Sequence, residues 1–133
     1  MTPLLLAVTE HEPTFWTTRW GRRPWIGYGL SSESGRFELI DGEMAELIQR
    51  VQSTTPEHVD GFAGRFWFLH HAELYLTEVA QCVRDLQHDF RWADIDGSVI
   101  QNNGPSTTGA HFDDAHGFLV QVAGSKRLRI LVA

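Results

Sequence analysis

His111 and Asp113 have the residue types and the spacing of a metal site. They stand two positions apart near the C-terminal end of the sequence. Along a strand, residues two apart point to the same side, so the imidazole and the carboxylate would enter one cavity. These groups are two of the three ligands of a 2-His-1-carboxylate iron site, which leaves metal positions open for other ligands. Such a pair also arises by chance, and a histidine on a strand is more often a plain core or surface residue.

The residues that follow this pair add weight to the metal interpretation. An apolar stretch, Phe118–Val122, is followed by a Gly124-Ser125 turn, and Lys126 stands fifteen positions after His111. This arrangement resembles the JmjC-like cupin family of Fe(II)- and 2-oxoglutarate-dependent oxygenases, which includes an asparaginyl hydroxylase and ribosomal-protein hydroxylases. Two further segments, 15–26 and 92–109, are similar to the opening segment and the pre-site strand and loop of these proteins.

The resemblance implies Fe(II) and 2-oxoglutarate as cofactors. His111 and Asp113 would then be iron ligands. Lys126 would bind the distal carboxylate of 2-oxoglutarate as a point charge, and Thr108 would hydrogen-bond the same carboxylate. The implied activity is hydroxylation of a peptide, a protein or an amino-acid side chain, in which the cofactor carries the oxidative chemistry.

The family pattern also includes a third ligand, a second histidine several tens of residues farther along. No residue up to Ala133 matches it. A cupin barrel needs later strands as well, and half a barrel would leave strand edges and apolar faces open. Three explanations compete: a fragment of a longer reading frame, a natural remnant, or a barrel completed by another chain, for example in a homodimer. We favour the fragment, because half a barrel is a poor stand-alone core.

Two other functions stay open at this point. The chain could be a non-catalytic, truncated cupin-like module that binds a partner or dimerises. It could instead be a small metal hydrolase or isomerase in which His116 joins His111 and Asp113; the commoner interpretation places His116 at a pocket mouth or in solvent. Asp114 is more often a turn residue than a group that orients His111.

The length and composition of the chain limit the classes of protein to which it can belong. The 133 residues are enough for one domain, and 42% of them are apolar, so a packed core is expected. The net charge of -6 disfavours a protein that binds along the phosphate backbone of a nucleic acid. Cys82 is the only cysteine, which excludes an internal disulfide and fits a reducing compartment. No apolar run is long enough to span a membrane. We expect a cytoplasmic protein without nucleic-acid or membrane partners.

The pattern of apolar residues along the chain predicts the helices and strands that must position the site, and these indicate an α+β fold in one domain, 1–133. A helical N-terminal part, 1–92, is expected to precede a strand-rich part, 93–133, which the resemblance implies to be the first strands of an incomplete double-stranded β-helix, the cupin or jelly-roll fold. Apolar spacing predicts helices over Pro13–Trp20, from the N-cap Asp41 through Val51, and over Ala72–Phe90. Strands are expected over Trp25–Gly29, Arg36–Ile40, Gly97–Ile100, Phe118–Val122 and Leu128–Val132, with Met1–Val8 as a further strand or packing arm.

Several remaining histidines and tryptophans have mainly structural interpretations. His70 and His71 are adjacent, so they point in different directions and do not chelate together easily. The other three histidines of the front part, His11, His58 and His88, are expected to be isolated and exposed. The tryptophans are more typical of a core than of a base-stacking surface, although Trp67 and Trp92 could line a substrate groove.

Overall fold

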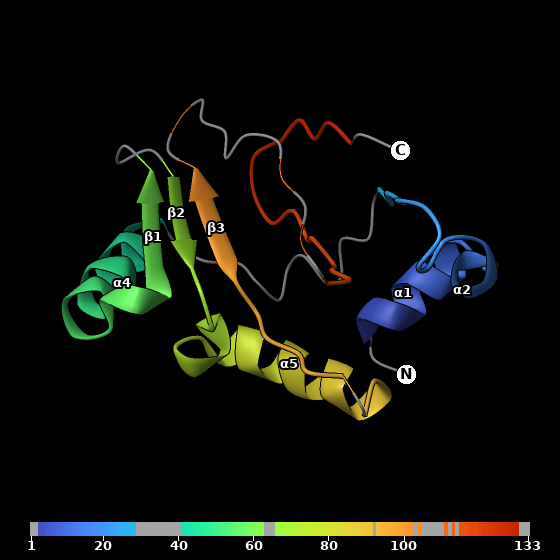
Figure 1. The fold of residues 1–133 in the computed structure, drawn as a ribbon, viewed down its shortest axis with the longest axis horizontal. Coiled ribbons are helices and arrows are strands. Elements are labelled where there is room, and N and C mark those ends of the chain that lie inside the picture. Colours follow the sequence, from blue (N-terminus) through green and yellow to red (C-terminus); the bar gives the residue numbers. More distant parts are fainter. Residues whose placement is uncertain are drawn as a thin grey trace. The chain divides into compact units, whose positions relative to one another are not determined.

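The computed structural model of the chain contains helices and one small antiparallel sheet, so the expected α+β class is confirmed (Figure 1). Its residues group into two compact units, Met1–Glu38 with Asp113–Ala133, and Leu39–Phe112, and each is described here by itself. No helix in the described part of the chain has both the length and the apolar character needed to cross a membrane. The structure describes residues 3–28, 41–62, 66–91, 93–102, 104, 111, 113 and 115–130.

The first unit begins with helix α1, Pro3–His11, where the sequence favoured a strand or an arm. Leu4, Leu5 and Val8 are buried on it, at the one-and-four spacing of a single helix face. The strand prediction was wrong because leucine and alanine are strong helix formers and nothing in this run alternates as a half-buried strand would.

The second helix of this unit, α2, Phe15–Thr18, is short and aromatic. Phe15 is 5% exposed. Its ring centroid lies 5.0 Å from that of Trp16, 6.2 Å from that of Trp20 and 5.3 Å from that of Trp25. The rings of Trp16 and Trp20 also meet edge to face, 5.7 Å apart, so the two side chains lie on the same side of this segment.

Three strands that the sequence predicted within this unit are not formed by its described residues. Trp25–Tyr28, Phe118–Val122 and 128–130 have no regular secondary structure. A strand needs a neighbour for its backbone hydrogen bonds, and all three strands in the described part of the chain belong to the other unit. The turn was placed correctly, since Gly124 has a φ of 69°. The strand expected over Arg36–Ile40 lies outside the described residues.

The second unit opens with helix α4, Asp41–Thr54. Its buried residues recur at helical spacing, which confirms the predicted apolar stripe. The 3-10 helix η2, Pro56–His58, follows, with the proline at its first position, where a missing N–H costs nothing. The buried residues of α4 are Met44, Leu47, Ile48 and Val51.

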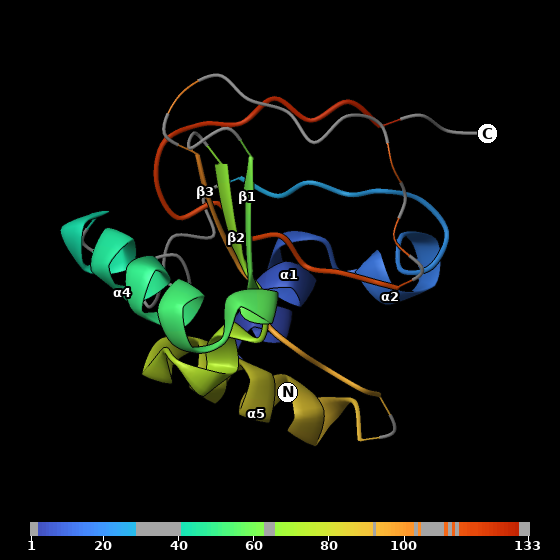
Figure 2. The same ribbon diagram turned by 60° about the vertical axis from the view of Figure 1, so that its left-hand side comes forward.

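A three-stranded antiparallel sheet with the order β1-β2-β3 forms the centre of this unit. The aromatic-rich segment Phe66–Leu69 is the central strand of this sheet. Gly61, Trp67 and Gln101 stand opposite one another in the register of the three strands. Figures 1 and 2 both show α4 alongside this sheet and α5 at the end where β2 stops and β3 starts. The strands are β1, Val59–Phe62, β2, Phe66–Leu69, and β3, Val99–Asn102.

The long helix expected over Ala72–Phe90 is divided. A 3-10 turn, η3, Ala72–Leu74, precedes helix α5, Thr77–Asp89. Leu76 between them is extended, with φ -124° and ψ 121°, and so separates the two. The apolar spacing that predicted the single helix placed Leu74 and Val79 together on its buried face. Val79 is buried, as predicted, but Leu74 is 66% exposed.

Candidate functional site

The two predicted iron ligands lie on either side of the point in the sequence where one unit ends and the other resumes. His111 belongs to Leu39–Phe112, and Asp113 to the unit that resumes after it. Both side chains are exposed, and neither residue has regular secondary structure. The strand geometry that would turn both groups to one side is therefore not part of the described structure. Thr108 lies outside the described residues.

Lys126 belongs to the same unit as Asp113 and is the only lysine of the chain. Its residue surface is largely exposed. Nearby protein atoms still remove part of the water around the ammonium group, and this partial burial lowers the pKa of Lys126 below its usual value. A partly desolvated cation gains more from a nearby carboxylate than a fully hydrated one does, which suits the role predicted for it.

His116 lies against an aromatic side chain. Its ring centroid is 4.9 Å from that of Trp20, and Phe118 stacks on Trp20 at 5.2 Å with an interplanar angle of 15°. His116 is exposed. The sequence singled out Trp20 as a helix residue and His116 as a pocket-mouth or solvent residue, but nothing in their spacing predicted that they would meet.

Whether the available groups fit iron can be judged by their chemistry. A neutral imidazole nitrogen and a carboxylate oxygen are ligands that Fe(II) accepts together, and His111 and Asp113 supply one of each. Within the described ranges, no three His, Cys, Asp or Glu side chains are arranged so that they could hold a metal ion. The argument for iron thus rests on donor type and spacing.

Sequence reasoning missed a pair of interacting side chains in the second unit. His58 Nδ1 and the Tyr75 hydroxyl are 2.7 Å apart and hydrogen-bonded, and the rings of His58 and His71 lie 5.2 Å apart. The expectation that His58 is isolated was therefore wrong. His71 has a φ of 52°, a conformation that few residues other than glycine adopt. These contacts join η2 to the segment around η3, so no helical or strand periodicity could reveal them.

His70 and Glu73 also make contacts that hold this unit together. His70 Nε2 is 2.6 Å from Asp60 Oδ2. Glu73 Oε2 accepts a hydrogen bond from the backbone N–H of Gly97 at 3.1 Å. His71 points elsewhere, with its Nδ1 3.5 Å from Glu73 Oε1, so the prediction that the adjacent histidines diverge is confirmed. All of these residues link chain segments, which is a structural role.

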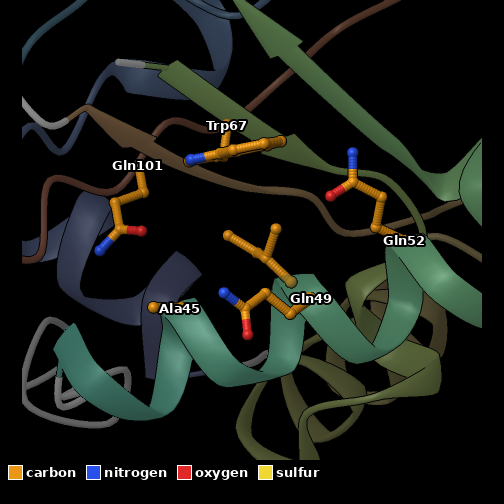
Figure 3. Close-up of a pocket in the computed structure, with 6 residues that line it drawn as sticks. Ala45, Gln49, Gln52, Trp67 and Gln101 are labelled. Carbon is orange, nitrogen blue, oxygen red and sulfur yellow. The ribbon is translucent and has the colours of Figure 1, made fainter. Parts of the chain in front are cut away.

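A pocket of about 180 Å³ lies within the second unit, between α4 and the sheet. Trp67 of β2 and Gln101 of β3 line it from the sheet. Figure 3 shows the Trp67 ring nearly edge-on at one side of the pocket, with Gln101 and Gln52 to either side of the opening. Trp67 is one of the two tryptophans for which groove lining was the alternative to a place in the core; the other, Trp92, lies outside the described residues. The helix contributes Ala45, Ile48, Gln49 and Gln52.

Comparison of the chain with protein-family models, with curated proteins and with solved structures found no match.

Proposed function

We propose that this chain has the function of a JmjC-like, Fe(II)- and 2-oxoglutarate-dependent oxygenase that hydroxylates a peptide, a protein or an amino-acid side chain. The observation that carries the proposal is the spacing of His111, Asp113 and Lys126, with the apolar stretch Phe118–Val122 between the pair and the lysine. The α+β class agrees with it, and the finer expectation, the first strands of a double-stranded β-helix, is part of the same proposal.

Each residue has a defined task in this proposal. His111 supplies a neutral imidazole nitrogen and Asp113 a carboxylate oxygen to the iron. Lys126 holds the distal carboxylate of 2-oxoglutarate by charge-assisted hydrogen bonds, with Thr108 as a second donor. The iron and the keto acid, when bound, supply the oxidative chemistry. A third protein ligand would come from outside the described residues.

Metal affinity is the direct test of the two ligands. We expect the chain to bind Mn²⁺, a redox-stable substitute for Fe²⁺, and His111→Ala or Asp113→Asn to weaken binding about tenfold or more, since each removes a ligand bond worth at least ~1.4 kcal/mol. Isothermal titration calorimetry with Mn²⁺, which can be carried out on every variant, is the measurement. His88→Ala is the matched control, because His88 is exposed on α5. Equal affinity in all four proteins would contradict the proposal.

The single lysine allows a separate test of the keto-acid anchor. We expect ¹³Cε-labelled Lys126 to titrate below its usual pKa, because partial burial disfavours the charged form. The folded chain then binds fewer protons than the unfolded chain between the lowered pKa and 10.5, so stability rises slightly with pH in that range. Added 2-oxoglutarate should move the pKa of Lys126 back upward. A pKa that does not respond to the keto acid would contradict the assigned role.

One observation favours the non-catalytic alternative. The segment after His116 exposes Leu119, Val122, Leu128 and Ile130 by 41–59% each. Apolar side chains left open in this way are typical of a surface that another chain covers. A chain that binds no Mn²⁺ and sediments as a dimer would favour a dimerisation module over the oxygenase.

A further inference from the structure

One wall of the α4–sheet pocket is an indole held flat by a glycine. Trp67 stands opposite Gly61 in the β1–β2 register. A Cβ atom at Gly61 would lie 2.5 Å from Trp67 Cζ3 and 2.9 Å from its Cε3, so the six-membered part of the ring lies over the glycine. The missing side chain lets the indole rest on the neighbouring strand, and its other face is free to border the pocket (Figure 3).

Three carboxamides surround this indole. Gln101 comes from β3, and Gln49 and Gln52 come from α4. Each carboxamide offers two N–H donors and a carbonyl acceptor. In the part of the chain that the structure describes, none of the three has a hydrogen-bond partner for its side chain. Polar groups with this double capacity are therefore available to a ligand at the edge of the indole.

The charge and size of the pocket restrict what it can bind. None of the described residues that line it is charged, so these residues offer no positive charge to a phosphate or a carboxylate. Its volume of about 180 Å³ is below the roughly 300 Å³ at which pockets for drug-sized ligands begin. Ile48, which is 3% exposed, and Ala45 give the helix side an apolar surface. The pocket suits one uncharged ring system.

We propose that this pocket binds an uncharged nitrogen heterocycle of the nucleobase type, as a free base or a nucleoside. Such a ring stacks on the Trp67 indole, and base–aromatic stacking is a general mode of recognition. A glutamine carboxamide pairs with the amide-like edge of the ring, as glutamine does with adenine. Stacking between aromatic and apolar side chains combined with hydrogen bonds at the ring edge is how proteins hold a single base. The net charge of -6 disfavours binding of a nucleic-acid strand, which is a polyanion, but not binding of an uncharged base or nucleoside.

Adenosine is the first probe. Titrated into the ¹⁵N-labelled chain, it should shift the Trp67 indole N–H and the side-chain NH₂ signals of Gln49, Gln52 and Gln101. A ligand this small is expected to bind with a dissociation constant on the order of 1 mM. The NH₂ signal of Gln121 is an internal control, because this side chain belongs to the other unit and donates to the Ala123 carbonyl oxygen at 2.7 Å.

Variants separate the pocket from general effects on folding. Gln101→Leu should weaken adenosine binding about tenfold, because it keeps the size of the side chain and removes the ring-edge hydrogen bonds. Gly61→Ala should weaken it as well by pushing the indole into the pocket, while Trp67→Leu removes the stacking surface. Gln121→Leu, the matched control, should bind like the unchanged chain.

Four outcomes would overturn the proposal. The pocket signals could fail to shift with adenosine up to about 10 mM, ten times the expected dissociation constant. Gln101→Leu could bind as tightly as the unchanged chain. Methyl β-glucopyranoside could bind more tightly than adenosine, which would assign the pocket to a sugar. AMP could bind more tightly than adenosine, which would mean that a phosphate site dominates. None of these outcomes depends on iron or 2-oxoglutarate, so they leave the proposed oxygenase function untouched.

Discussion

Replacing Leu69 with alanine is expected to lower the free energy of unfolding by about 2–5 kcal/mol. Leu69 ends the central strand β2, pairs with Val59 and Val99 on its two sides, and is 1% exposed. Truncation removes buried methyl groups and leaves a cavity that neighbours on three strands cannot fill without moving. Urea denaturation followed by far-ultraviolet circular dichroism measures the change.

Leu74→Ala is the matched control for this experiment. It makes the same chemical change five residues after the end of β2, at a leucine that is 66% exposed. We expect its effect to stay within about 0.5 kcal/mol. Equal losses for the two variants would show that Leu69 is not in a packed core, and the assignment of β2 as the central strand would then be wrong.

The sequence predicted best where one regular pattern decides the outcome. In α4 the apolar residues Met44, Leu47, Ile48 and Val51 recur at helical spacing, and all four are buried. Here the amphipathic period, the local propensity and the packing agree, so the sequence alone suffices. The short aromatic helix around Trp16 was predicted for the same reason. Side chains three or four residues apart are neighbours on the surface of a helix, and Trp16 and Trp20 have this spacing.

Prediction failed where the outcome depends on partners elsewhere in the chain. Phe118–Val122 is a short apolar run typical of a strand, but a strand forms only if another segment pairs with it, and the run itself does not specify such a partner. The helix expected over Ala72–Phe90 is divided at Leu76. There the contact of Ala72 N–H with the Gly97 carbonyl oxygen, at 2.8 Å, holds the first turn against the approach to β3.

The candidate sites show the same division. The types and spacing of His111, Asp113 and Lys126 could be read directly, because donor chemistry belongs to the residues themselves. Their convergence on one metal is a matter of tertiary structure and stays a prediction. The pocket beside Trp67 depends on the register that brings Gln101 opposite it, and registers across non-consecutive segments cannot be deduced from one sequence.

Replacing Gly97 with alanine tests the contact that positions β3. A Cβ atom there would lie 2.5 Å from Val79 Cγ1 and 3.4 Å from Val83 Cγ2. The backbone cannot move away easily, because its N–H donates to Glu73 Oε2 at 3.1 Å and its carbonyl oxygen accepts from Ala72 N at 2.8 Å. We expect a loss of about 1–3 kcal/mol in the free energy of unfolding, the usual cost of overpacking. Urea denaturation measures it.

Two further variants show whether the loss comes from this clash. Gly117→Ala makes the same change where a Cβ meets no atom within 4 Å, and should alter stability by less than about 0.5 kcal/mol. Val79→Ala removes the atom that the new methyl group would strike. The double variant should therefore be more stable than the sum of the single effects predicts, by about 0.5–3 kcal/mol, because residues in contact couple. Strict additivity would mean that Gly97 and Val79 do not touch, and the packing of the segment before β3 against α5 would then be wrong.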